Sequence, residues 1–226
     1  MGTKKYRLTG NHINIGNRIL YQIEALKDFG DVKAGDLGGY IESEENLSQY
    51  DNAWVYGDAQ VLGNAQVFDN ARVYGNACVF DNARVYGNAC VFGNAQVFDN
   101  ARVYGNACVF DNARVYGNAC VFDNAEVYGN ALVYDNAQVF GNARVFGDAQ
   151  IKSARDYIVF KNWWSSGRYF TWTRSNNMWK VGCFYGTGEE LIKKAYNDSK
   201  ESGREYERVV RYVEEILEEN YGNKED

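Results

Sequence analysis

The sequence predicts a mainly β protein in which a long solenoid carries a different segment at each end. Three observations support this class. A phrase of the form Val-(Tyr/Phe)-(Gly/Asp)-(Asn/Asp)-Ala-x repeats every six residues, with its aliphatic position running from Val55 to Ile151. Residues 1–52 lack this repeat, and the composition changes abruptly after Ile151. We therefore divide the chain into an N-terminal cap (1–52), a repeat region (53–151) and a C-terminal α+β domain (152–226).

The bulk composition is typical of a soluble, reduced protein. The chain has 226 residues, 46% of them hydrophobic, with 23 Gly and no Pro, so its turns depend on Gly, Asn and Asp. It lacks an apolar run long enough to span a membrane, and "MGTKKYRLTG" lacks a signal-peptide core. Four of the five cysteines share one slot of the repeat, which argues against a disulfide framework. We expect a cytoplasmic protein whose net charge of −6 disfavours general polyanion binding.

The first segment is expected to cap the solenoid. It contains strand-like pieces in "INIGNRILYQIEALKDF" and a Gly-rich turn in "GDVKAGDLGGYI" that lacks the Lys and the helix of a phosphate loop. The motifs "ALKDF", "DVKAGDLGGYI" and "LSQ" resemble the start of the YdcK-like transferases over about forty residues. The resemblance implies a cap that seals the open edge of the first coil, and it brings no catalytic residues with it.

The repeat itself predicts short strands joined by tight corners. A fixed period of six residues is not a helical period, and three β-prone residues followed by Gly-Asn or Asp-Asn read as a strand and a corner. Gly and Asn suit the corner because they tolerate positive φ. The pattern resembles the hexapeptide-repeat left-handed β-helix family, in which three hexapeptides form one triangular coil. This implies a single-stranded left-handed parallel β-helix of about five to six coils, with Val and Ala pointing inward.

Strand alternation then predicts outward ladders of aromatic residues, one member per coil. We expect at least one ladder to form a wall that is covered by a partner subunit or by another part of the chain, because large apolar patches are seldom left bare. The predicted wall consists of Phe80, Phe98, Tyr116 and Tyr134. Simple cross-strand packing within one chain is the alternative interpretation of the same ladder. We expect a homo-oligomer.

The C-terminal segment is predicted to fold as a small sheet followed by two helices. The alternation in "RYFTWTR" and "MWKVGCF" indicates a β-hairpin, and "DYIVFKNW" adds a third strand. The sequence "TGEE" is a capping box in which Thr187 begins a helix and Glu190 reaches back. Ser202-Gly203 is expected to separate this helix from a second one.

Residues 152–186 combine six basic residues and one acidic residue with four of the five tryptophans. Basic and aromatic side chains together favour binding of a nucleotide or of single-stranded nucleic acid, because rings stack on bases and cations contact phosphates. The candidate binding residues are Trp164, Arg168, Arg174, Trp179 and Lys180. The alternative is that Trp163, Trp172 and Trp179 form the core of the domain. Strand alternation favours a core position for Trp172.

The histidine and cysteine residues bear on catalysis and metal binding. Hexapeptide-repeat acyltransferases, which the repeats resemble, use a catalytic His at a coil edge, whereas the single His of this chain, His12, lies outside the repeats. We therefore assign no catalytic residues and no cofactor. The cysteines lack a His or Cys partner at metal-ligand spacing, so we assign no metal site either.

These observations favour a non-enzymatic binding protein with the solenoid as a rigid, oligomerising scaffold. The stretch "MWKVGCFYGTGEELIKKA" resembles a module of phage and prophage proteins, which suggests an inhibitor of a host defence system acting in the host cytoplasm. Its partner would be a host protein or a nucleotide-type ligand, and the acidic helical tail leaves nucleic-acid contact or mimicry open. An acyltransferase-like enzyme and a filament-forming structural protein are the alternatives.

Overall fold

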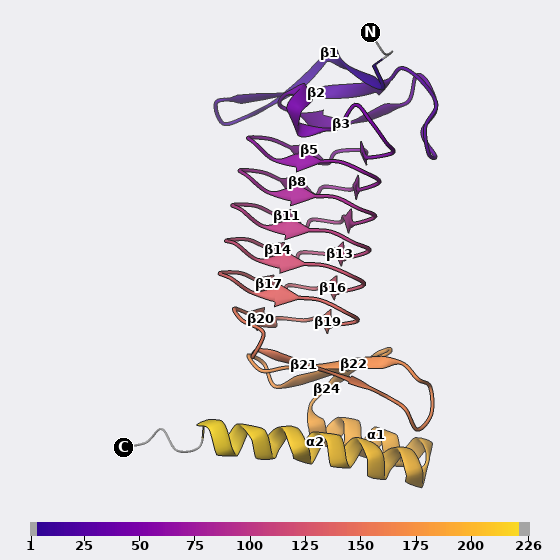
Figure 1. Cartoon of the computed structure of the whole chain (residues 1–226), viewed down its shortest axis with the longest axis vertical. Coiled ribbons are helices and arrows are strands. Elements are labelled where there is room, and N and C mark those ends of the chain that lie inside the picture. The colour runs from indigo at the N-terminus through magenta and orange to yellow at the C-terminus, as the bar shows by residue number, and fades with distance from the viewer. Residues whose placement is uncertain (1–3, 222–226) are drawn as a thin grey trace. The chain divides into compact units, whose positions relative to one another are not determined.

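The computed structural model describes residues 4–221, and the side chains of residues 4–219. It contains two compact units, Met1–Asp156 and Tyr157–Asp226. The first holds a small antiparallel sheet and a stack of short parallel strands, and the second holds a four-stranded sheet and two helices (Figure 1). The predicted β-solenoid class is confirmed. No helix in the described part of the chain is long and apolar enough to cross a lipid bilayer.

The cap is a meander of three strands, β1 (Tyr6–Ile15), β2 (Arg18–Ala25) and β3 (Leu37–Ile41), followed by the short helix η1 (Glu44–Asn46). The Gly-rich stretch predicted as a turn forms turns over residues 30–36 and continues as strand β3 over Leu37–Ile41. Its glycines are needed for close packing, because a Cβ on Gly38 would lie 2.6 Å from Ile23 Cγ1 and one on Gly39 would lie 2.5 Å from the oxygen of Ala59. Strand β3 pairs in parallel with the solenoid and so continues its first sheet.

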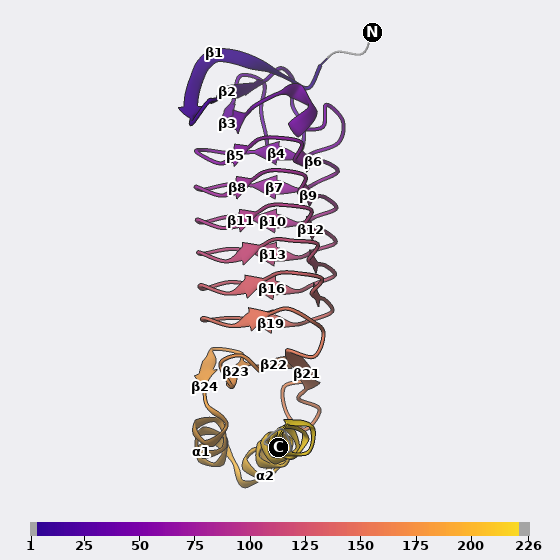
Figure 2. The same ribbon diagram turned by 90° about the vertical axis from the view of Figure 1, so that its left-hand side faces the viewer.

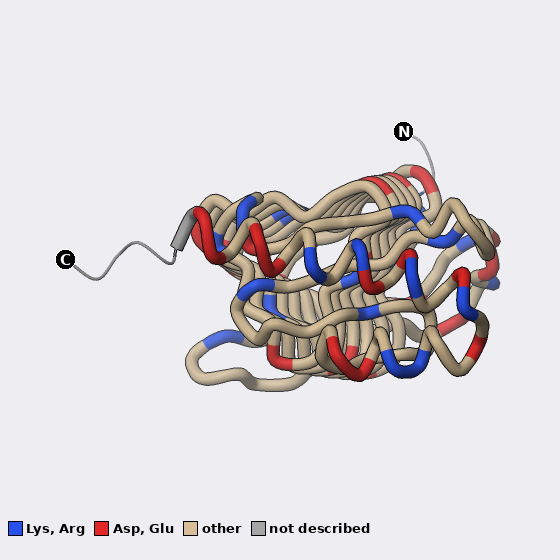
Figure 3. Tube along the Cα trace, turned by 90° about the horizontal axis from the view of Figure 1, so that it is seen from below, with Lys and Arg blue, Asp and Glu red and all other residues tan. Residues whose placement is uncertain are grey.

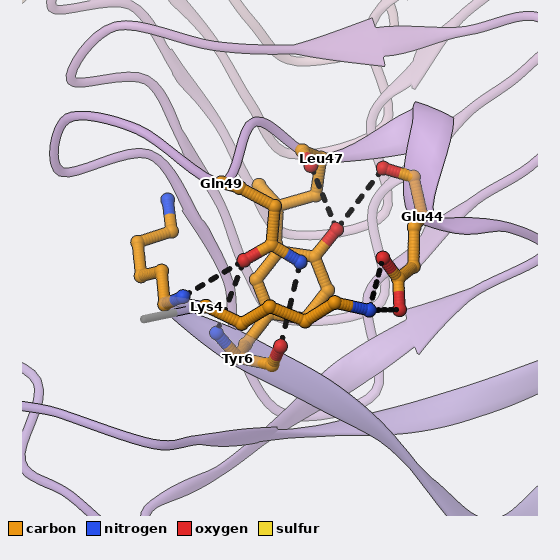
Figure 4. A network of polar contacts seen from close by, with 6 residues as sticks. Lys4, Tyr6, Glu44, Leu47 and Gln49 are labelled. Carbon is orange, nitrogen blue, oxygen red and sulfur yellow. Dashed lines mark hydrogen bonds and ion pairs between the residues drawn. The ribbon is translucent and has the colours of Figure 1, made fainter. Parts of the chain in front are cut away.

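Buried polar contacts join the start of the cap to the segment that leads into the first coil (Figure 4). Tyr6 donates its hydroxyl to the carbonyl of Leu47 at 2.7 Å, and Gln49 accepts from the backbone amide of Lys5 at 2.8 Å. The ammonium of Lys5 is fully buried and donates to the carbonyl of Ala53 at 2.8 Å. These contacts satisfy backbone groups that would otherwise form an unpaired edge.

The solenoid has three faces, each built from parallel strands whose register partners are 18 residues apart in sequence, such as Arg84 and Arg102 (Figure 2). The β5 face contains β5 (Gln60–Val61), β8 (Cys78–Val79), β11 (Gln96–Val97), β14 (Arg114–Val115), β17 (Leu132–Val133) and β20 (Gln150–Ile151). The β4 face contains β4 (Trp54–Val55), β7 (Arg72–Val73), β10 (Cys90–Val91), β13 (Cys108–Val109), β16 (Glu126–Val127) and β19 (Arg144–Val145). The β6 face contains β6 (Gln66–Val67), β9 (Arg84–Val85), β12 (Arg102–Val103), β15 (Cys120–Val121) and β18 (Gln138–Val139).

Each position of the hexapeptide has one structural role. The Val and Ala side chains fill the interior and are essentially inaccessible, as at Val103 and Ala107. The Gly or Asp that follows the aromatic residue has positive φ, for example 70° at Gly75 and 58° at Asp69. The following Asn residues form amide ladders along each corner, with Asn64 Nδ2 donating to Asn82 Oδ1 at 3.0 Å. The six-residue period is thus the spacing between one corner and the next.

The C-terminal unit is an antiparallel sheet in sequential order, formed by β21 (Tyr157–Lys161), β22 (Tyr169–Thr173), β23 (Met178–Val181) and β24 (Phe184–Gly186). Two helices follow, α1 (Gly188–Asp198) and α2 (Lys200–Tyr221), and pack against the face that carries Phe170, Trp172 and Trp179. The sheet has one strand more than predicted.

The helix start was predicted correctly and the helix break was not. Thr187 accepts from the Glu190 amide at 3.3 Å, and the Glu190 carboxylate accepts from the Thr187 amide at 2.8 Å, so the capping box is present. The chain breaks at Ser199, whereas Ser202-Gly203 lies inside α2. Gly203 serves packing instead, since a Cβ there would lie 2.3 Å from the Tyr196 ring.

Candidate functional site

The β21–β22 loop presents the most prominent aromatic group of the C-terminal unit. Trp163 is 73% exposed at this loop, which connects two strands of the sheet (residues 162–168). Lys161 and Arg168 are exposed at the two ends of this loop, and Tyr169, the first residue of the next strand, is 39% exposed. The ammonium of Lys161 lies 5.8 Å from the centroid of the Tyr169 ring, a cation–π contact. We call Lys161, Trp163, Arg168 and Tyr169 the hairpin cluster.

The loop is held in one conformation by a buried asparagine. Asn162 is 4% exposed, and its side-chain amide donates to the Tyr206 hydroxyl on α2 at 2.9 Å. Its side-chain oxygen accepts from the Ser165 amide at 2.9 Å, and its backbone amide donates to the Arg168 carbonyl at 2.8 Å. Asn162 therefore links the loop to the helical core, so that Trp163 is presented on an ordered support.

The two adjacent tryptophans have exchanged their predicted positions, one at the surface and one in the core. Trp164, predicted to bind a ligand, packs edge-on against Tyr206 with centroids 4.9 Å apart and lies against the core. Trp163, one of the three alternative core residues, is the exposed member. Trp179 is 2% exposed in the core, so its assignment to a surface site was wrong, whereas the core position of Trp172 is confirmed.

The predicted basic residues are not gathered at one place. Arg168 precedes β22 and Arg174 follows it, so the strand separates their Cα atoms by roughly 20 Å at about 3.4 Å per residue. Lys180 lies in the middle of β23, where its register partners are Thr171 and Tyr185. Only Arg168 of the five predicted residues is both exposed and close in the chain to Trp163.

The predicted aromatic wall is a regular stack on the β5 face. Phe80 and Phe98 have centroids 4.8 Å apart at an interplanar angle of 1°, and Phe98 and Tyr116 have centroids 4.9 Å apart at 3°. Tyr116 and Tyr134 continue the stack at 5.3 Å. All four rings are partly exposed. The geometry supports packing within the chain and also leaves ring edges available to a partner.

An open groove of about 870 Å³ runs along a corner of the solenoid beside the cap. Its lining includes Arg18, Glu42, Asp81 and Asp99. The Glu42 carboxylate accepts from the Gly63 amide at 2.7 Å and from the Arg18 guanidinium at 2.6 Å. The Gly63 hydrogen bond, assisted by Arg18 and opposed by burial, lowers the pKa of Glu42 and so favours its ionised carboxylate.

The single histidine and the possible metal-binding clusters are the remaining candidate sites. His12 lies on β1 in the cap, where its ring nitrogen contacts the carbonyl of Gly10 at 3.2 Å. Residues 4–219 contain no group of three or more His, Cys, Asp or Glu side chains placed to hold a metal ion.

The fold and these surfaces define a β-solenoid protein of the hexapeptide-repeat type, with an appended α+β unit. Comparison with known families agrees: the YdcK β-solenoid repeat matches residues 65–81, 83–97, 95–109 and 137–152. A stretch of 40 residues is 50% identical to the "Uncharacterized acetyltransferase YdcK" of Escherichia coli (strain K12), which covers 18% of this chain and 12% of that protein. The four matched segments are thus similar to the YdcK β-solenoid repeat, and the 40-residue likeness spans about an eighth of the length of that relative.

Proposed function

We propose that this protein is a non-enzymatic binding protein in which the solenoid is a rigid scaffold and the hairpin cluster contacts the partner. The observation that carries the proposal is the 73% exposure of Trp163 on a loop anchored by the buried Asn162. Exposed tryptophan beside arginine is the composition of an interface hot spot, because both bury a large surface when a partner covers them.

The shape of the loop favours a macromolecular partner over a small molecule. Small ligands bind in concave sites that enclose most of their surface, whereas Trp163 projects from a connection between two strands. Lys161 and Arg168 add positive charge, so the matching surface would be acidic. We commit to a protein partner with an acidic patch. Given the resemblance of residues 178–195 to phage and prophage modules, we propose a host defence component as the class of partner.

The acidic helical tail offers weaker support for mimicry of nucleic acid. On α2, Arg208 pairs with Glu205 at 2.7 Å and Arg211 pairs with Glu214 at 2.8 Å. Basic and acidic residues therefore alternate along the helices rather than forming a continuous acidic surface (Figure 3). We base the proposed interaction on the hairpin cluster for this reason.

The test compares Trp163→Ala with Tyr212→Ala, which removes another exposed aromatic side chain of the same unit. The protein is used to capture partners from a lysate of its host, and the affinity of the captured protein is measured by calorimetry. Loss of a hot-spot tryptophan should weaken binding about thirtyfold, equivalent to about 2 kcal/mol, while Tyr212→Ala should bind normally. Equal affinity of the two variants would remove the hairpin cluster from the interface. Salt-sensitive binding of a thymidine oligonucleotide that is lost in Trp163→Ala would favour nucleic acid instead.

We further propose self-association through the β5 face. Beside its aromatic wall this face carries one charged strand residue, Arg114, whereas the β6 face places Arg84 directly beside Arg102 and would repel a copy of itself. Native mass spectrometry gives the subunit number. Phe98→Glu should reduce that number and Tyr104→Glu on the β6 face should not.

Acyl transfer is the second candidate because of the name of the relative. An acyltransferase should retain acetyl-CoA, so calorimetry with acetyl-CoA separates the two functions. Measurable binding that is lost in His12→Ala would support transferase activity, and absence of binding would support the scaffold function.

A further inference from the structure

Two of the four repeat cysteines lie directly next to each other. Cys90 on β10 and Cys108 on β13 are register partners in adjacent coils of the β4 face. The other two are isolated, with Cys78 between glutamines on the β5 face and Cys120 between Arg102 and Gln138 on the β6 face. All four thiols are free and partly exposed.

The spacing of the pair suits a covalent bond between coils. Neighbouring parallel strands lie about 4.8 Å apart, which is inside the range of roughly 4.4–6.8 Å between the Cα atoms of disulfide-bonded cysteines. Because the two strands are in register, both side chains point outward from the same face. The Cβ atoms of such parallel partners are also about 4.8 Å apart, slightly beyond the roughly 3.5–4.5 Å of a disulfide, so the bond requires rotamer changes and a small approach of the two coils.

The charges along the β4 face make the two thiols unequal. Arg72 precedes Cys90 and Glu126 follows Cys108 in the sheet. The hydrogen bond from Cys108, aided by Arg72 and opposed by burial, lowers the pKa of Cys90 to about 7. The same contact, together with burial and Glu126, raises the pKa of Cys108. Near neutral pH Cys90 is therefore the partly ionised thiol of the pair and Cys108 the protonated one, whereas burial raises the pKa of the isolated Cys78 and Cys120.

We infer that Cys90 and Cys108 form a peroxide-reactive dithiol site, with Cys90 as the nucleophile and Cys108 as the resolving thiol. The Cys90 sulfur attacks one oxygen of hydrogen peroxide, the O–O bond breaks, and hydroxide leaves and is protonated by solvent to water. Cys90 is then a sulfenic acid. The Cys108 sulfur attacks the Cys90 sulfur, an S–S bond forms, and the hydroxyl leaves with the Cys108 proton as a second water. The two thiols lose two electrons, which reduce the peroxide.

The first experiment oxidises the full-length protein with hydrogen peroxide and maps its peptides by mass spectrometry. Residues 73–84 and 103–114 have identical sequences, so tryptic peptides of Cys78 and Cys108 are indistinguishable and the mapping is done in a Cys78→Ser background. We expect a disulfide between residues 85–102 and 103–114 within one chain. With Cys108→Ser, Cys90 should accumulate as a sulfenic acid that dimedone traps. Oxidation that stops at a sulfenic acid on Cys90 with both thiols present, or that forms only links between chains, would overturn the assignment.

The second experiment measures thiol reactivity without an oxidant. At pH 7 a thiol whose pKa is about 7 is half ionised, against a few per cent for an ordinary cysteine, and its lower intrinsic nucleophilicity offsets part of this gain. Iodoacetamide should therefore modify Cys90 at least about threefold faster than Cys120, which occupies the same repeat slot. Circular dichroism of each Ser variant establishes that it is folded. Equal rates at Cys90 and Cys120 in a folded protein would contradict the proposed nucleophile.

Discussion

Replacing the corner residue Gly75 tests the account of the solenoid corners. Gly75 has φ of 70°, and a Cβ there would lie 3.1 Å from both N and O of Gly93 in the next coil. The Asp residues at equivalent corners show how a side chain is accommodated. Their φ is roughly 12° smaller, 58° at Asp69, and the Asp69 carboxylate accepts from the Gly87 amide at 3.1 Å.

At this corner we therefore expect the larger Asp side chain to destabilise the solenoid less than the smaller Ala side chain. Gly75→Ala incurs the left-handed backbone penalty of about 1–2 kcal/mol together with crowding against Gly93. Gly75→Asp recovers about 1 kcal/mol through a hydrogen bond to the Gly93 amide, and Asp tolerates this conformation better than Ala. The expected difference of at least 1 kcal/mol corresponds to about 2–4 °C in Tm for a chain of this size.

Thermal unfolding followed by far-ultraviolet circular dichroism measures this difference. Gly141→Ala is the matched control, because Gly141 has φ of 67° but a Cβ there would meet nothing within 4 Å. This variant should incur only the backbone penalty, so its Tm should be higher than that of Gly75→Ala. If Gly75→Asp unfolds at or below the Tm of Gly75→Ala, the proposed contact between corners of successive coils is wrong.

Three further outcomes are expected. Val103→Asp places an unpaired charge in the solenoid interior and should unfold the middle coils, so a folded, protease-resistant variant would contradict the inward position of Val103. Thr187→Ala removes half of the capping box with Glu190 and should lower the stability of the C-terminal unit by about 1 kcal/mol in urea unfolding. Burial lowers the pKa of Lys5 from 10.5 to about 8, so the folded chain releases this proton first and cap stability should rise with pH from about 8 to 10. Burial raises the pKa of Tyr6 above its usual value of 10.0, so stability should fall above pH 10 as the unfolded chain ionises. Melting curves across this pH range would show a maximum, and a monotonic trend would argue against the buried positions of both groups.

The solenoid was predictable because every position of the repeat has one physical role. A period of six with an invariant Ala and an aliphatic residue fixes which side chains point inward, and Val103 and Ala107 are buried as expected. The capping box at Thr187 was equally readable, since its contacts are local in sequence.

The predictions that failed concern residues whose role depends on contacts distant in sequence. Gly38 and Gly39 were interpreted as turn residues from the sequence. They lie in a strand instead, where β3 passes so close to Ile23 and Ala59 that only glycine fits. Gly203 likewise resembled a helix break in the sequence. In the structure its lack of a side chain makes room for Tyr196 within the helix. At the candidate site, strand alternation ends at Lys161, so periodicity could not decide which of Trp163 and Trp164 faces solvent. The pairing of Asn162 with Tyr206 decides it, and these residues lie 44 positions apart.

The regular offset of 18 residues between hydrogen-bonded partners also bears on how the chain can evolve. Duplication or loss of one whole coil within the gene would leave each remaining corner, amide ladder and ring stack with an equivalent neighbour. The solenoid would change its length by about 4.8 Å per event without a change in its cross-section. Insertions whose length is not a multiple of six residues would move Val out of its inward position. Selection can therefore adjust the length of this scaffold in fixed steps while the sequence of each coil stays almost constant.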